Sequence, residues 1–146
     1  MSFSTILFSL TGRLNRAPYW LAGIGLLATG LILSFITLLI NTHSVTSDPF
    51  VNDVFLLLIF LLLIWVGFAL TTKRLHDRDK SAWWVLMFYL APSILQTIGQ
   101  DTTGSTRSVL MILIGTGISI WGFVELGFLR GTAGQNSYGP DPLPIR

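Results

Sequence analysis

The densest polar segment of this chain is residues 71–84, TTKRLHDRDKSAWW, which lies between two long apolar runs. It contains a histidine next to a carboxylate, His76 and Asp77, which is a pair that acid–base catalysis or a metal site would use. One such pair is weak evidence for either chemistry, because a metal site needs further ligands and the chain has no cysteine. We therefore predict no metal, no cofactor and no catalytic residue.

Positive side chains in three segments could together bind an anion. Lys and Arg residues next to membrane spans attract anionic lipid headgroups, and the glycine-rich residues 131–134 could add main-chain N–H donors. This glycine run lacks the Gly-Lys-Ser/Thr ending of a nucleotide-binding loop, so nucleotide hydrolysis is not supported. The candidate residues for binding an anion or a lipid are Arg13, Arg16, Lys73, Arg74, Arg78, Lys80 and Asn136.

A second, overlapping set could bond internally and form a polar core. Arg74 and Asp77 lie one helical turn apart and could pair. Glu125 is the one formal charge inside an otherwise apolar span, and it could partner a cation, titrate, or reach interfacial water. Its expected partners, if it is buried, are Arg16, Lys73 and Arg74. The candidate polar core consists of Arg74, His76, Asp77, Glu125, Asn136 and Tyr138.

Four apolar stretches must position these residues. The chain is 51% hydrophobic and 11% charged, against about 25% charged in a typical soluble domain. Since about 20 apolar residues cross the bilayer core as a helix, we predict an all-α integral membrane bundle of four transmembrane helices in a single domain, residues 1–146. The spans are about 20–40, 54–70, 82–98 and 109–129, with a short interfacial helix within residues 2–11 and an extended tail at 130–146.

Two details of these spans carry structural expectations. Pro92 interrupts the third span by removing one backbone donor, so a three-span protein with a re-entrant third segment is the alternative. Small residues recur on one face of the first and fourth spans, and small residues let helix backbones approach closely. These predicted packing positions are Gly23, Gly30, Ser34, Thr37, Gly115, Ser119 and Gly122.

The distribution of Lys and Arg predicts the orientation. Two precede the first span, four lie in residues 71–81 and two lie in the tail, whereas the two opposite loops hold only Arg107. Short loops rich in Lys and Arg stay in the cytoplasm. We therefore expect a multi-pass protein of the bacterial inner (plasma) membrane with a cytoplasmic N-terminus and a cytoplasmic C-terminus.

Three ordered motifs resemble those of the bacterial membrane family called domain of unknown function 805. They are GRLNRAPYW at residues 12–20, RLHD at 74–77 followed by KSAWW at 80–84, and GTAGQNSYGPDP at 131–142. The chain departs from the family pattern in the middle motif: Arg78 and Asp79 replace an apolar residue and a glycine, and Ala82 replaces a glycine. The resemblance implies a small inner-membrane protein and implies no reaction.

The favoured function is that of a non-enzymatic inner-membrane protein whose specific activity is unknown. Its cytoplasmic motifs would bind one another, anionic membrane lipid, or a protein partner, which includes a second copy of the chain. We expect no nucleic-acid partner. A small transporter or channel is the first alternative, and a membrane enzyme that acts on a lipid or phosphate group at the cytoplasmic surface is the second. A transporter predicts polar residues facing one another at mid-depth, whereas the other two predict convergence at the cytoplasmic end.

Overall fold

Long runs of mostly apolar residues form the helices of this chain. The computed structural model describes residues 3–42, 49–101 and 105–143, and within them it contains no strand, only one isolated bridge between Asn136 and Gly139. The all-α prediction is therefore confirmed. The helices are α1 (Phe3–Phe8), α2 (Arg16–Thr42), α3 (Pro49–Asp77), a π-helix, η1 (Leu86–Leu90), α4 (Ala91–Asp101) and α5 (Thr106–Gly127).

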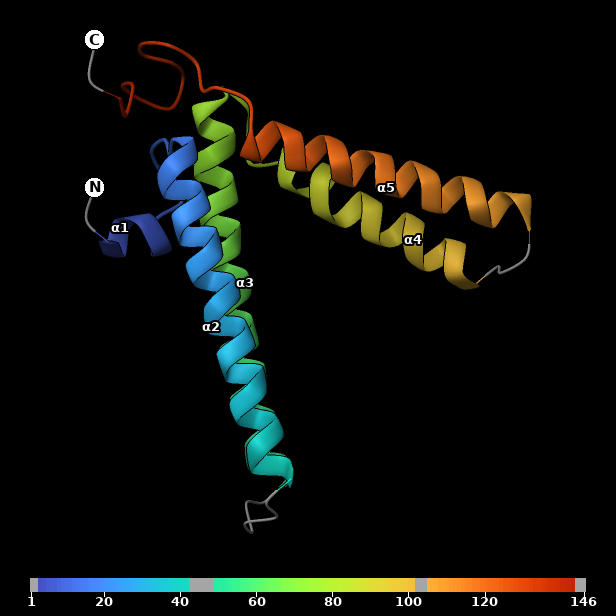
Figure 1. Cartoon of the computed structure of the whole chain (residues 1–146). Helices are drawn as coiled ribbons and strands as arrows, with labels where there is room; N and C mark the ends of the chain where they lie inside the picture. The colour runs from blue at the N-terminus through green and yellow to red at the C-terminus, as the bar shows by residue number, and fades with distance from the viewer. Residues whose placement is uncertain (1–2, 43–48, 102–104, 144–146) are drawn as a thin grey trace.

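The long helices pack as two antiparallel pairs. α2 lies along α3, and η1 with α4 lies along α5 (Figure 1). The two pairs meet at one end of the molecule and diverge away from it (Figure 1). Four helical segments are thus present, but a bundle in which all four lie side by side is not confirmed.

Within the described part of the chain, three helices are long and apolar enough to cross a membrane. They cover Arg16–Leu39, Asp53–Asp77 and Thr106–Gly127, and they make the chain a membrane protein. Two of them extend past the predicted spans at the polar end, since α2 begins before residue 20 and α3 continues past residue 70. The predicted third span, residues 82–98, is not a single α-helix but a turn followed by η1 and α4.

Pro92 explains the π-helical turn in the third segment. Proline has no backbone N–H, so the carbonyl of Phe88, four residues earlier, has no α-helical donor. The turn before Pro92 widens instead, and the N–H of Ala91 donates to the carbonyl of Leu86, five residues earlier. A π-helix of five residues is the result, and it turns Phe88 into the core, where 4% of its surface stays exposed.

The predicted small-residue faces differ in outcome. In α5, a Cβ on Gly115 would lie 3.1 Å from the carbonyl oxygen of Pro92, and one on Gly122 would lie 2.9 Å from Phe88, so both glycines allow close packing on η1 and α4. In α2, nothing lies within 4 Å of the Cβ position of Gly23. The prediction is correct for α5 and wrong for Gly23, because the second pair of helices leaves α2 along most of its length.

The hydrophobic core lies at the end where the pairs meet. One buried cluster contains Leu14, Val66 and Leu70, with α1 packed against it, and a second contains Leu75, Phe88 and Leu126. The predicted N-terminal helix is present as α1, although it is shorter than expected. Its place in a membrane interface stays a prediction. The core therefore fixes the start of α2, the end of α3 and the end of α5 against one another.

Candidate functional site

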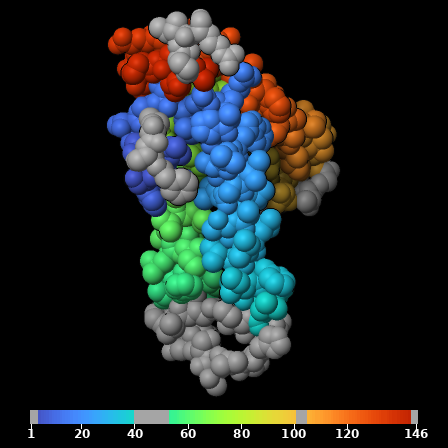
Figure 2. Space-filling view, turned by 60° about the vertical axis from the view of Figure 1, so that its left-hand side comes forward, coloured from blue at the N-terminus to red at the C-terminus, as the bar shows by residue number. Residues whose placement is uncertain are grey.

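The polar segments meet at one end of the molecule. We call this region the polar junction, and define it as residues 12–16, 73–80 and 125–141. The tail folds over the ends of α3 and α5 (Figure 1), and it lies beside the start of α2 in the space-filling view (Figure 2). The convergence at one end agrees with the predictions for a binding protein or a surface enzyme, and not with polar residues gathered at mid-depth.

Asp77 occupies the centre of the polar junction. Its Oδ1 lies 3.1 Å from Arg13, and its Oδ2 lies 2.5 Å from Nη1 of Arg74. All three side chains are buried, with exposed fractions of 2% for Asp77, 3% for Arg13 and 0% for Arg74. The predicted pairing of Arg74 with Asp77 is confirmed. Two guanidinium groups thus share one carboxylate, and hydrogen bonds must satisfy their remaining donors.

Those donors go to main-chain carbonyls at the end of α5 and in the tail. Nε of Arg74 donates to the carbonyl of Leu126 at 2.7 Å, and its Nη2 donates to that of Leu129. The last carbonyls of a helix have no partner within it, so Arg74 caps α5. Arg13 donates to the carbonyls of Gly134 and Thr132. The two arginines therefore join α3, α5 and the tail.

Lys73 plays a similar role for α1. It is fully buried, and its Nζ donates to the carbonyl of Thr5 at 2.9 Å and to that of Ile6. These carbonyls belong to the last turn of α1, where a cation is favourable. Lys73 is thus enclosed by protein and cannot reach a ligand in this structure.

Glu125 forms a second ion cluster. Its Oε1 lies 3.0 Å from Nε of Arg78 and 2.9 Å from Nζ of Lys80, whose ammonium also lies 4.5 Å from the ring centroid of Trp84. The expectation of a buried Glu125 paired with a cation is correct in kind. The partners predicted for it, Arg16, Lys73 and Arg74, are wrong, because the last turn of α5 faces the turn that follows α3.

His76, Asn136 and Tyr138 fix the tail to the end of α3. The His76 ring lies parallel to the Tyr138 ring, with 3.9 Å between their centroids, and its Nδ1 lies 3.2 Å from the carbonyl oxygen of Gly12. Nδ2 of Asn136 donates to the His76 carbonyl at 2.8 Å. In the described ranges no group of three or more His, Asp or Glu side chains could hold a metal ion. These contacts hold the tail against the end of α3.

Asp79 preserves a turn that a glycine would favour. Its φ is 56°, in the left-handed region that asparagine and aspartate tolerate better than other side chains. Its Oδ1 accepts a hydrogen bond from the N–H of Ser137 at 3.2 Å. The departure from the family pattern at this position therefore keeps the turn and adds a bond to the tail.

A hollow of about 480 Å³ opens between the start of α2, the end of α5 and the tail. Arg16, an exposed residue, and Arg130, also exposed, line it, and Nη1 of Arg16 donates to the carbonyl of Phe128 at 2.9 Å. Buried Arg74 and Asp77 form part of its wall. Asp141 lines it too.

The charge of Asp141 is held by the tail itself. The N–H groups of Leu143 and Gly134 donate to its two carboxylate oxygens, each at 3.0 Å, and they hold the pKa of this carboxyl below its usual range. A depressed pKa means that folding stabilises the ionised carboxylate. Asp141 therefore contributes to the stability of the folded tail at neutral pH. Its contribution disappears as the pH falls through that lowered pKa.

The hollow divides the seven predicted anion-binding residues into two groups. Arg16 is exposed and lines the hollow, and its Nη1 bonds to a main-chain carbonyl there. The other six form ion pairs or hydrogen bonds inside the polar junction or with α1, namely Arg13, Lys73, Arg74, Arg78, Lys80 and Asn136. Trp20 also lines the hollow. Sequence reasoning missed Arg130 and Trp20 as site residues. Arg130 counted toward the positive side of the membrane, and only its position directly after α5 could have marked it.

Comparisons with known proteins give the chain a family without an activity. The profile of the family described as "Protein of unknown function (DUF805)" matches residues 7–140. The chain is similar to the uncharacterized protein YiiR of Escherichia coli strain K12 and of Escherichia coli O157:H7. Each is 28% identical over 146 residues, which cover 100% of this chain and 94% of the relative. No solved structure matches.

Proposed function

Because this chain belongs to the DUF805 family, whose description names no function, we propose a function from the polar junction itself. The chain is a non-enzymatic inner-membrane protein that binds a phosphate-bearing anion in the hollow beside Arg16 and Arg130. The source of that anion is the headgroup of an anionic membrane lipid. The buried part of the polar junction is the support that holds the two pairs of helices together and keeps these arginines in place.

The observation that carries this proposal is the contrast between two kinds of cation. Arg13, Arg74, Arg78 and Lys80 each lie within ion-pair distance of Asp77 or Glu125. Arg16 and Arg130 have no such carboxylate among residues 3–42, 49–101 and 105–143, although both line a cavity. Three arginines and two aspartates line that cavity, so its net charge is positive, and both aspartates already accept hydrogen bonds.

The location of the polar junction supports the same ligand. Seven of the nine Lys and Arg residues lie in its three segments, so the positive-inside rule assigns it to the cytoplasmic face. Anionic headgroups are available at that face, and each nearby Lys or Arg contributes about 1 kcal/mol to binding them. An arginine fork also matches the geometry of a phosphate.

The antiparallel pairing of α4 with α5 supports four crossings. α5 ends at the polar junction and begins at the far end of its pair, while η1 and α4 lead away from the polar junction along it (Figure 1). If α5 crosses the bilayer, the chain must cross before it to reach the start of α5. This argument favours four crossings over a three-span protein with a re-entrant segment.

Native mass spectrometry of the protein released gently from its membrane tests the proposal. We expect bound phosphatidylglycerol or cardiolipin on the wild type. Arg16→Ala and Arg130→Ala should each weaken binding about fivefold, as the loss of about 1 kcal/mol per arginine requires. Arg107→Ala is the matched control, because it removes the same charge from the start of α5, far from the hollow.

Two results would contradict the proposal. If the wild type carries no anionic lipid, or if all three variants retain it equally, the hollow is not a phosphate site. The polar junction then serves only to hold the helices together. Thermal unfolding of each variant, measured in the same detergent, shows whether a loss of lipid reflects a loss of fold.

A further inference from the structure

An apolar groove adjoins the hollow and lies between the two pairs of helices. This groove has a volume of about 220 Å³, and it lies between α2 and the end of α5. Ile24, Leu27 and Phe123 form its walls, and their exposed fractions are 60%, 64% and 55%. Trp20 and Gly127 line both the groove and the hollow, so the two spaces adjoin directly.

We propose that this groove holds an acyl chain of the same anionic lipid whose headgroup the hollow binds. The proposal rests on the proposed function and extends it from the headgroup to the whole ligand. The ligand class is then an acylated, phosphate-bearing lipid that enters between the pairs of helices. A soluble phosphate compound or a lipid held by its headgroup alone does not belong to this class.

The face of α2 that borders both spaces changes along the helix from charged to aromatic to aliphatic, as a lipid changes from headgroup to acyl chain. Arg16, Trp20 and Ile24 follow at intervals of four residues, so they lie on one face of the helix, and Leu27 continues it. At 1.5 Å per residue, Arg16 and Leu27 are about 16 Å apart along the axis, which is close to half of the roughly 30 Å hydrocarbon core. The acyl chain of a lipid in one leaflet spans about the same depth.

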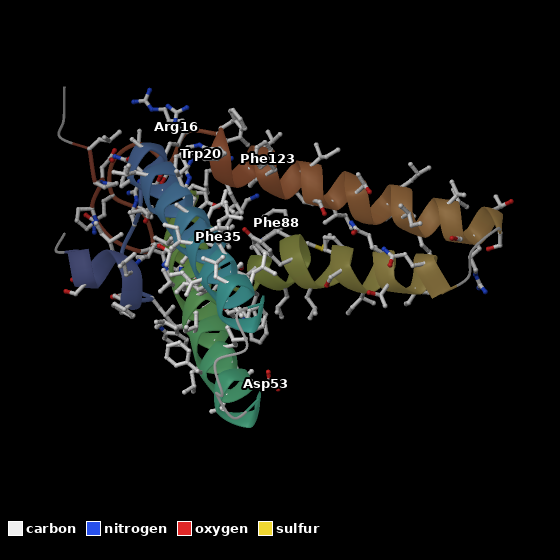
Figure 3. The ribbon with its side chains drawn as sticks, turned by 60° about the horizontal axis from the view of Figure 1, so that its bottom comes forward. Arg16, Trp20, Phe35, Asp53, Phe88 and Phe123 are labelled. Carbon is white, nitrogen blue, oxygen red and sulfur yellow. The ribbon has the colours of Figure 1, made fainter. Side chains whose placement is uncertain are left out.

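Trp20 stands at the boundary between the polar and apolar spaces. Its Nε1 donates to the carbonyl of Gly127 at 3.0 Å, and its ring meets those of Phe123 and Phe128 edge to face at 5.8 Å and 6.0 Å. Figure 3 shows Arg16, Trp20 and Phe123 together where α2 meets α5. Indole rings favour the depth at which headgroups give way to acyl chains, so the headgroup belongs on the Arg16 side.

Because the two pairs of helices diverge, the space between them must be filled by another molecule. The groove opens into the space between α2 and α5, and exposed apolar side chains face that space from both helices. Within a bilayer core, only apolar groups can fill such a space without loss of hydrogen bonds. The adjoining pair of arginines selects among the available lipids by charge, and therefore favours an anionic one.

The test is photocrosslinking of the full-length protein in vesicles that contain phosphatidylglycerol with a diazirine in one acyl chain. We expect peptides around Ile24, Leu27 and Phe123 to be labelled at least fivefold more than by phosphatidylcholine with the same chain. Ile24→Trp, which fills the groove, should remove this excess. Leu21→Trp is the matched control, since Leu21 is 75% exposed on α2 and does not line the groove.

The outcomes separate this inference from the proposed function. Equal labelling by the two lipids, or labelling spread evenly over the helices of the wild type, overturns the acyl-chain site even where arginine-dependent retention of phosphatidylglycerol persists. Complete displacement of the photolipid by an equal concentration of inorganic phosphate overturns it as well. No arginine-dependent retention at all overturns the proposed function. The labelling pattern of the wild type alone can overturn the acyl-chain site. The proposal can therefore be tested even if a variant fails to fold.

Discussion

Asp77 compensates two buried guanidinium groups at once, so the polar junction depends more on its charge than on any other single group described. Asp77→Asn keeps the shape but leaves Arg13 and Arg74 without a counter-charge. Breaking a buried ion pair by removing one partner costs about 3–5 kcal/mol. We expect a loss of that size in the free energy of unfolding, measured by titration with a denaturing detergent.

The control for this change is Asp53→Asn. Asp53 is exposed near the far end of α3 (Figure 3), so removal of its charge should change stability by less than about 0.5 kcal/mol. Equal effects of the two substitutions would mean that Asp77 is solvated, and that the polar junction is looser than its contacts indicate.

Asp79 offers a test of backbone conformation at the same scale. Asp79→Ala and Asp79→Gly both remove the bond to Ser137, so they differ chiefly in the cost of the φ of 56°. A left-handed conformation costs a side chain about 1–2 kcal/mol that glycine avoids. We expect the alanine variant to be less stable than the glycine variant by that amount in thermal unfolding. An alanine variant of equal stability would show that the turn adopts another conformation.

At the scale of elements, Gly122 sets how closely α5 packs on η1. A Cβ at this position would lie 2.9 Å from two carbons of Phe88, so Gly122→Ala must move the ring or the helix. Overpacking of this kind costs about 1–3 kcal/mol. Gly117→Ala, with nothing within 4 Å of its Cβ position, should instead stabilise α5 by about 0.5–1 kcal/mol. Unfolding free energies of the two variants should therefore shift in opposite directions, and shifts in the same direction would contradict the packing.

The helices show what could be predicted from local sequence and what could not. Hydropathy located all four segments, because a long apolar run in a bilayer satisfies its backbone hydrogen bonds most simply as a helix. It placed the end of α3 near residue 70 instead of Asp77, because charges usually mark the membrane surface. In this structure the charges do not end the helix, since Lys73 and Arg74 bond to carbonyls of distant segments.

The candidate site divides in the same way. The pairing of Arg74 with Asp77 is a matter of helical spacing and was predictable. The partners of Glu125 were not, because they depend on how the turn after α3 meets α5. Arg130 was not predicted as a site residue for the same reason: it lines the hollow only because the tail folds back beside Arg16.

At the scale of the whole molecule, one polar end holds two apolar pairs of helices that diverge. The tail bonds to α3 through Asn136 and His76, so the tail and the end of α3 must lie on the same side of the membrane. If α5 crosses the bilayer, it leads from the opposite side to that tail. From these constraints and the positive-inside rule we predict a complete topology, which labelling can test.

The absence of cysteine makes this test direct, because each introduced thiol is the only one in the chain. We predict that Thr106→Cys, at the exposed start of α5, reacts with a membrane-impermeant maleimide in intact spheroplasts. Gln135→Cys, in the exposed part of the tail, should react only after the membrane is opened. Labelling of both thiols from outside would contradict the cytoplasmic polar junction. Protection of both would mean that α5 does not cross the bilayer, and the re-entrant alternative would then extend to the whole second pair of helices.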